Sequence, residues 1–176
     1  EQGKLAIWSL VHRRREGGEI DHGGEIASVS ISHDDRRVLA ANTAGRWASW
    51  RIPIESRATA AVNGHHPSGV TGAKYWSNDR HVVTFGLDGT TRIWDATRAV
   101  ELGTLFGHTG VVVGDVDPSG RQLATAGEDR LLHLWSIELE WLLGAAALAD
   151  ALEAIQLVPS RAWAPPVDQE PLAILD

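Results

Sequence analysis

Residues 64–95 read GHHPSGVTGAKYWSNDRHVVTFGLDGTTRIWD, and this stretch decides the fold. It contains three short runs, 70–76, 81–86 and 90–95, that are rich in β-branched residues and alternate apolar with polar positions. Gly, Pro, Asn, Asp and Ser separate the runs, and these residue types form tight turns. The stretch therefore predicts short antiparallel strands joined by turns.

The same pattern recurs along the chain with a period of about 40–45 residues. Tryptophans separated by 42, 44 and 41 residues mark it at Trp8, Trp50, Trp94 and Trp135. Histidines separated by 43 and 43 residues mark it at His22, His65 and His108. Two residue types that share one period and one phase indicate a repeat architecture.

The Gly-His pairs at 64–65 and 107–108, the Trp-Asp pair at 94–95 and the period together resemble the WD40 repeat family of β-propellers. The resemblance covers residues 1–137. It implies an all-β fold, a partial β-propeller of about three and a half four-stranded antiparallel blades. A partial first blade is followed by three repeats.

The resemblance also implies a structural tetrad in each well-matched repeat, made of a His, a Ser or Thr, an Asp and the Trp. By spacing, the two expected tetrads are His65, Thr84, Asp88 and Trp94, and His108, Thr125, Asp129 and Trp135. A buried indole N–H needs an acceptor, and a carboxylate can hold an imidazole in one tautomer. These residue types resemble a catalytic triad, but a Thr repeated once per blade favours a structural role.

The second repeat departs from this pattern. It keeps His22 and Trp50, but Ala40 and Ala44 stand where Thr and Asp are expected. We therefore expect the N-terminal half of the blades to be the less tightly held.

The alternation also predicts strand positions for each blade. The expected ranges are 4–10 and 18–21 for blade one; 26–32, 37–42, 46–52 and 58–62 for blade two; 70–76, 81–86, 90–95 and 100–105 for blade three; and 111–117, 121–126 and 131–137 for blade four.

The pattern stops at about residue 137, and residues 138–176 are expected to form a separate extension. Apolar residues at spacings of three and four favour an amphipathic helix over 139–157. The alternative is that 141–146 is the outer strand of blade four. Four of the seven prolines lie within 159–171, which predicts an extended Pro-rich tail.

The composition excludes several classes of function. With no cysteine there is no disulfide, thiolate metal site or cysteine nucleophile. A net charge of −7 argues against a nucleic-acid or anionic-membrane surface, and the basic run at 13–15 is interpreted as a solvated loop. The pair His65-His66 lacks a carboxylate at ligand spacing, so no metal or other cofactor is expected. No secretion signal or apolar span is found, which makes the cytoplasm the default location, and the Arg- and Ala-rich composition favours a bacterial source.

These observations predict a non-catalytic interaction scaffold that binds a protein or peptide. In the family the resemblance names, partners sit on the face that carries the turns between the second and third strands. The residues expected on that face are Glu25, Thr43, Thr71, Leu87, Val112 and Glu128. The alternative is the sensor region of a multidomain bacterial signalling NTPase or kinase. Three and a half blades cannot close a ring, so the remaining blades of a parent chain, of which these would be the C-terminal part, or of other copies are expected partners.

Overall fold

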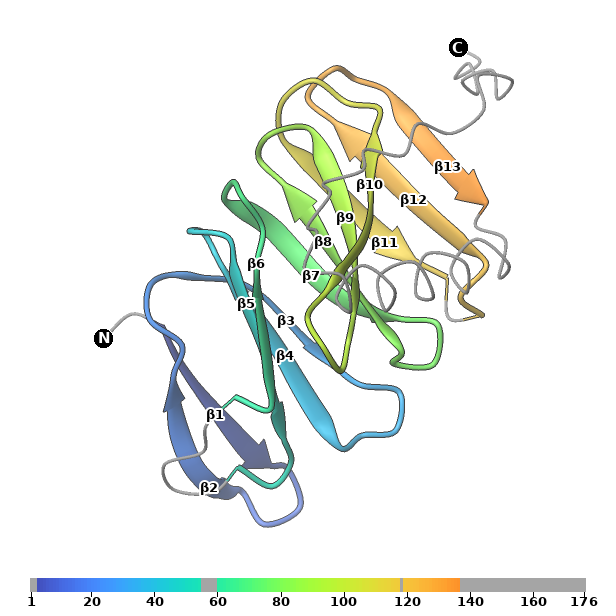
Figure 1. The fold of residues 1–176 in the computed structure, drawn as a ribbon. Coiled ribbons are helices and arrows are strands. Elements are labelled where there is room, and N and C mark those ends of the chain that lie inside the picture. Colours follow the sequence, from blue (N-terminus) through green and yellow to red (C-terminus); the bar gives the residue numbers. More distant parts are fainter. Residues whose placement is uncertain (1–2, 55–59, 118, 137–176) are drawn as a thin grey trace, which may run out of the picture.

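The computed structural model describes residues 3–54, 60–117 and 119–136, and within these ranges every regular element is a β-strand (Figure 1). The strands form four antiparallel sheets, which we number as blades one to four. Blade one consists of β1 (Lys4–Ser9) and β2 (Arg14–Asp21). Blade two consists of β3 (Ile26–Ile31), β4 (Arg37–Asn42), β5 (Arg46–Arg51) and β6 (Val62–His65). Blade three consists of β7 (Val70–Trp76), β8 (His81–Gly86), β9 (Thr90–Asp95) and β10 (Glu101–Phe106), and blade four of β11 (Val112–Val116), β12 (Gln122–Gly127) and β13 (Leu132–Ser136).

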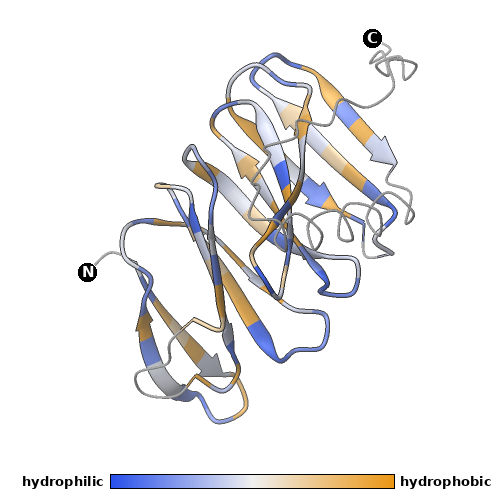
Figure 2. Ribbon diagram, in the orientation of Figure 1, coloured by the Kyte–Doolittle hydropathy of each residue, from blue (hydrophilic) through white to orange (hydrophobic). Residues whose placement is uncertain are grey.

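Each blade is a simple meander, in which consecutive strands pair as neighbours. The blades stand face to face in a row from β1 to β13, with the first strands β3, β7 and β11 of successive blades side by side (Figure 1). Apolar residues lie mainly in the strands, while the turns at the two ends of the strands are mostly polar (Figure 2). The row therefore has two turn edges. The upper edge holds the turns β2–β3, β4–β5, β6–β7, β8–β9, β10–β11 and β12–β13, and the lower edge holds the others.

The core lies in the spaces between neighbouring blades. Leu39 and Trp47 of blade two pack with Tyr75 of blade three, and none of these side chains is more than 7% exposed. Phe85 of blade three packs with Leu123 of blade four in a second cluster. Sheets that bury large side chains in this way behave as stacked layers, each stabilised by its neighbours.

Glycine lets the upper-edge turns approach the next blade closely. Gly89 has a φ of 84°, and a Cβ built on it would lie 2.3 Å from the His108 carbonyl oxygen. Gly45 occupies the same place in blade two, where a Cβ would lie 2.2 Å from the Ser68 oxygen. Only glycine combines this backbone conformation with such a contact.

A second connection between blades lies at the lower edge. The buried carboxylate of Asp79, in the β7–β8 turn, accepts hydrogen bonds from the backbone N–H groups of His33 at 2.8 Å and Asp34 at 3.2 Å. In return, the Arg37 guanidinium donates to the Asp79 carbonyl at 3.2 Å and lies 5.0 Å from the centre of the Tyr75 ring. Blades two and three are thus joined by polar contacts as well as by their core.

The all-β class and the four-stranded antiparallel sheets agree with the sequence prediction, and most strand limits fall within a residue or two of it. Strands β2 and β6 are the exceptions, because β2 covers 14–21 rather than 18–21 and β6 covers 62–65 rather than 58–62. The connection after Trp50 is longer: 16 residues separate Trp50 from His66, against 14 between Trp94 and His108. The helix expected at 139–157, its alternative as an outer strand at 141–146 and the Pro-rich tail lie outside the described residues.

Candidate interaction surface

Blade three contains a continuous hydrogen-bonded network around Trp94. The indole Nε1 of Trp94 donates to Thr84 Oγ1 at 2.9 Å, and Thr84 Oγ1 is 2.8 Å from His66 Nδ1. His66 Nε2 lies 3.3 Å from Asp88 Oδ1, which also accepts from the hydroxyl and backbone N–H of Thr90 at 2.7 and 3.1 Å. Thr84 Oγ1 accepts from Trp94 and can therefore donate its own hydrogen to His66 Nδ1. The hydrogen of the neutral His66 ring is accordingly assigned to Nε2, which faces the Asp88 carboxylate.

Blade four repeats the network with the imidazole turned over. Trp135 Nε1 donates to Thr125 Oγ1 at 2.8 Å, and Thr125 Oγ1 lies 2.9 Å from His108 Nε2. His108 Nδ1 lies 3.0 Å from Asp129 Oδ2. The backbone N–H of Leu131 donates to Asp129 Oδ1 at 3.0 Å, which ties the β12–β13 turn to the network. Here the hydrogen of the imidazole is assigned to Nδ1.

The histidine expected in blade three is corrected from His65 to its neighbour. His65 is the last residue of β6 and is exposed, whereas the His66 side chain is fully buried and makes the contacts to Thr84 and Asp88. The longer connection after Trp50 shifts this histidine by one position. The signal was present in the sequence, because 28 residues separate both His22 from Trp50 and His66 from Trp94.

The electrostatics of these networks fit a structural role. Burial lowers the pKa of the His66 imidazole, against the opposing effect of Asp88, so the ring is neutral at pH 7. Burial disfavours the charged form of Asp88, but hydrogen bonds from Thr90 and His66 outweigh it and lower the pKa of the carboxyl. The Thr84 hydroxyl is buried and already bonded on two sides, so it cannot reach a substrate. Among the described residues, no group of three or more His, Asp or Glu is placed to hold a metal ion.

Blade two replaces the network with a different residue, Asn42. It occupies the position of Gly86 and Gly127 in the other blades. The Asn42 side chain donates to the Gly23 carbonyl at 2.6 Å and accepts from the Arg46 backbone N–H at 3.0 Å. His22 contacts the edge of the Trp50 ring at 5.3 Å, and its Nε2 lies 3.3 Å from the Arg46 carbonyl oxygen. The sequence interpretation missed Asn42, although a polar residue in place of two glycines was a visible signal.

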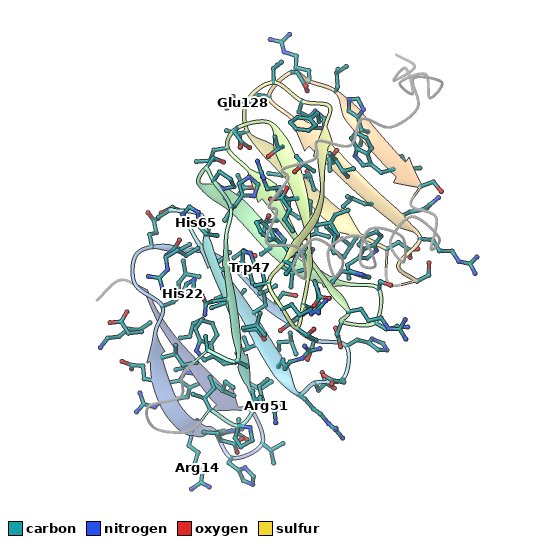
Figure 3. All side chains as sticks on the ribbon, viewed as in Figure 1. Arg14, His22, Trp47, Arg51, His65 and Glu128 are labelled. Carbon is teal, nitrogen blue, oxygen red and sulfur yellow. The ribbon has the colours of Figure 1, made fainter. Side chains whose placement is uncertain are left out.

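The upper turn edge carries most of the residues expected to contact a partner. Figure 3 shows His22, His65 and Glu128 along this edge, while Arg14 and Arg51 lie at the opposite one. Backbone hydrogen bonds join each turn to the start of its own first strand: Thr43 to Glu25 at 2.9 Å, Leu87 to Gly69 at 2.8 Å. The third such bond, Glu128 to Val111, is 3.2 Å long.

Four of the six expected face residues are exposed on this edge, namely Glu25, Thr43, Leu87 and Glu128. Leu87 is 44% exposed, so this turn presents an apolar side chain to solvent. A Cβ built on Gly69 would lie 2.3 Å from the Thr43 carbonyl oxygen and 2.7 Å from Leu87 Cδ1. The turns of blades two and three therefore form one continuous surface, with Gly69 as its floor.

The remaining two expected face residues lie elsewhere. Val112 is fully buried in the cluster with Phe85 and Leu123, so it cannot contact a partner. The pairing of Val112 with Gly127 matches that of Val70 with Gly86, which places the face position of β11 one residue later, at Val113, 53% exposed. Thr71 is half-buried, and its hydroxyl donates to the Val112 carbonyl of the next blade.

Two tryptophans outside the networks are core residues. Trp47 is fully buried and lies 5.8 Å from the Trp94 ring, and Trp76 is 2% exposed. Both therefore pack between blades rather than contacting a partner.

A family model described as "WD domain, G-beta repeat" matches residues 57–95 and 99–136. The first match covers β6 of blade two and β7–β9 of blade three, and the second covers β10 of blade three and β11–β13 of blade four, so each contains one His–Thr–Asp–Trp network. No helix in the described part of the chain has the length and apolar character needed to cross a membrane.

Several curated proteins are similar to this chain. Protein HIR1 of Cryptococcus neoformans var. neoformans serotype D is 33% identical over 169 residues, which cover 80% of this chain and 19% of that protein. An uncharacterized WD repeat-containing protein of Schizosaccharomyces pombe is 28% identical over 139 residues, 76% of this chain and 25% of that protein. The ribosome biogenesis protein YTM1 of Chaetomium thermophilum is 29% identical over 120 residues, 62% of this chain and 24% of that protein.

The chain spans a quarter or less of the length of these three relatives. They come from fungi, so they give no support to the expected bacterial source or to a bacterial signalling NTPase or kinase. WD40 repeat proteins typically act as protein-interaction scaffolds.

Proposed function

Residues 57–95 and 99–136 are repeats of the WD40 family, and with this membership as premise we propose that the chain is a non-catalytic scaffold that binds a protein or peptide on its upper turn edge. The observation that carries the proposal is that the polar residues of the chain fall into a buried set and an exposed set. The groups that resemble catalytic machinery are buried and bonded to one another. The exposed groups belong to adjacent turns of three blades.

The proposed contact surface has the features of a peptide-binding edge. Leu87 offers an exposed apolar side chain at its centre, with the flat Gly69 beside it. Glu25 and Glu128 flank it with carboxylates that form no salt bridge to another described residue. An apolar centre with a charged rim is the usual arrangement of a protein-binding patch. Names such as that of YTM1, a ribosome biogenesis protein, are consistent with membership of an assembly.

The test is a binding comparison of matched surface variants. A peptide array probed with residues 1–176 supplies a ligand, whose affinity is then measured by calorimetry for the unaltered chain, for Leu87→Ala and for Arg51→Gln on the opposite edge. We expect Leu87→Ala to weaken binding by about fivefold or more, as a central contact does, and Arg51→Gln to leave it unchanged. Equal affinities for all three chains would refute the upper edge as the binding surface.

The scaffold is proposed to lack an activity of its own and to work in the cytoplasm with no cofactor, nucleic acid or membrane. Other blades, from the same parent chain or from further copies, are proposed to pack against blades one and four. Val29 and Ile31 of β3 are 52% and 59% exposed on the face turned toward blade one, where β1 and β2 cover only the outer half of the sheet. The equivalent residues of blade three, Ala73 and Tyr75, are buried against blade two.

A further inference from the structure

The lower turn edge carries exposed arginines that form no salt bridge within the described residues, although Arg36 and Arg121 lie near the carboxylates of Asp34 and Asp117. These exposed side chains, none of which forms a salt bridge to another described residue, are Arg13, Arg14, Arg36, Arg51, Arg80 and Arg121. They come from all four blades. Arg14 and Arg51 project from this edge in Figure 3. A guanidinium keeps its charge at any physiological pH, so the edge presents a line of permanent cations.

Most carboxylates of the same edge already accept hydrogen bonds from backbone N–H or hydroxyl groups within the blades, although they keep their negative charge. Asp79 is buried and accepts the backbone N–H groups of His33 and Asp34. Asp34 accepts from the Ser32 hydroxyl at 2.6 Å and the Arg36 backbone N–H at 3.0 Å. Asp117 accepts from the backbone N–H of Ser119 at 3.1 Å and from its hydroxyl. Asp35 is the exposed carboxylate that remains beside the arginines.

The upper edge has the opposite character. Its turns carry Glu25, Asp88, Glu128 and Asp129, against Arg130 alone among the turn residues. The two edges of the row thus differ in the sign of the charge they offer.

The strongly acidic part of the chain begins at the basic edge. Residues 137–176 contain seven Asp and Glu and one Arg, and thus account for most of the net charge of −7. Strand β13 runs from the upper edge to the lower one and ends at Ser136, which pairs with Gln122, the residue after Arg121 (Figure 1). The acidic segment is therefore tethered close to Arg121, one of the arginines that form no salt bridge.

We propose that the acidic segment 138–176 of this chain binds the lower edge of its own blades. Tethering raises its effective concentration to the millimolar range, so weak individual ion pairs suffice. Reach is no obstacle, because the 39 residues of this segment extend to about 130 Å, and blade one lies about three sheet spacings, roughly 30 Å, from blade four. Nucleic acid is the less favoured ligand of these arginines, because the whole chain has a net charge of −7 and repels a polyanion.

The absence of cysteine makes a direct test possible. A spin label on Gln169→Cys, between two carboxylates of the segment, broadens the NMR signals of any surface it visits. We expect the backbone signals of the turns around Arg36 and Arg80 to broaden, and those of Thr43 and Leu87 to remain sharp. The broadening should decrease about threefold to tenfold when salt is raised from about 0.05 to 0.5 M, because exposed ion pairs are screened.

Charge variants of the full chain provide the control. The triple variant Arg36→Gln, Arg80→Gln, Arg121→Gln should lose the broadening, whereas Arg46→Gln with Arg130→Gln on the upper edge should keep it. Equal broadening of both edges, or broadening that the triple variant retains, would overturn the proposal. Circular dichroism of both variants shows whether the fold is kept.

A competition measurement decides between the segment and nucleic acid. Replacing the seven carboxylates of 138–176 by their amides should increase the affinity for a single-stranded oligouridylate at least about threefold, and by clearly less in the triple variant Arg36→Gln, Arg80→Gln, Arg121→Gln, because the lost negative charge is the same in both but only the former has these arginines to free. Identical oligouridylate affinities with and without the carboxylates would show that the edge is open to nucleic acid and refute the intramolecular contact. Neither result depends on a partner of the upper edge.

Discussion

Blades two and three tie equivalent turns to the neighbouring connection by different polar contacts. In blade three, Trp94 is bonded through Thr84 and His66 to Asp88 in the turn. In blade two, the Thr and Asp positions are Ala40 and Ala44, and Asn42 instead bonds the turn to Gly23 of the preceding connection. The comparison shows that both blades bond the turn to the neighbouring connection, whereas the residues that form these hydrogen bonds can differ.

The two solutions exclude one another at a single position. A Cβ built on Gly86 would lie 2.4 Å from both Asp88 Oδ1 and His66 Nε2, and one on Gly127 would lie 2.6 Å from His108 Nδ1. A His–Asp pair therefore requires glycine there. Once the Asp is lost, as at Ala44, the position can hold a side chain such as Asn42.

The largest effect is expected when the centre of the blade-three network is removed. Thr84→Val keeps the shape of the side chain but leaves Trp94 Nε1 and His66 Nδ1 without a partner in a buried site. Each unpaired buried group costs about 1–3 kcal/mol, so the free energy of unfolding in urea should fall by that amount for each of the two. Thr43→Val, on an exposed turn of blade two, is the control and should change stability by less than about 0.5 kcal/mol.

The next effect tests whether the blade-two arrangement excludes the His–Asp pair. Gly86→Asn in blade three places a side chain against Asp88 and His66, and overpacking of this kind costs about 1–3 kcal/mol. Combined with Asp88→Ala, the same substitution should cost less than the sum of the two single changes. A double-mutant cycle in urea measures the coupling, and strict additivity would contradict the explanation given for Asn42.

A smaller loss is expected when the substitute in blade two is removed. Asn42→Ala deletes two hydrogen bonds, worth about 0.5–1.5 kcal/mol each, from a side chain that is 1% exposed. Hydrogen exchange should become faster at the Arg46 amide, which loses its acceptor, with blade four unaffected. A stability equal to that of the unaltered chain would mean that blade two needs no tie at this turn.

The smallest effect concerns pH. Burial lowers the pKa of His22, His66 and His133 below the ordinary value of 6.5. Below pH 6.5 these imidazoles are therefore protonated more readily in the unfolded chain than in the folded one. The free energy of unfolding consequently decreases as the pH falls through 6.5 toward the pKa values of the folded chain. NMR titration of the imidazole signals should give midpoints below 6.5 for all three, and urea denaturation at pH 8 should require more denaturant than at pH 6.

The strand plan was predictable because each repeat alternates apolar and polar positions between Gly- and Asp-rich turns. The network members Thr84, Asp88 and Trp94 were predictable for a related reason, since all three lie within one uninterrupted hairpin and keep a fixed spacing. His66 was not assigned correctly because its distance from the tryptophans passes through a connection of variable length. Val112 was misplaced by one residue on a strand, and a shift of one residue moves a side chain to the other face.

The contact made by Asp79 has a consequence for how the row opens. The amides of His33 and Asp34 belong to blade two, yet their acceptor belongs to blade three. Their exchange with solvent is therefore controlled by the separation of the two blades rather than by the fraying of either one. A domain built in this way opens by separation of neighbouring blades, and the exchange of these two amide protons reports the separation of blades two and three.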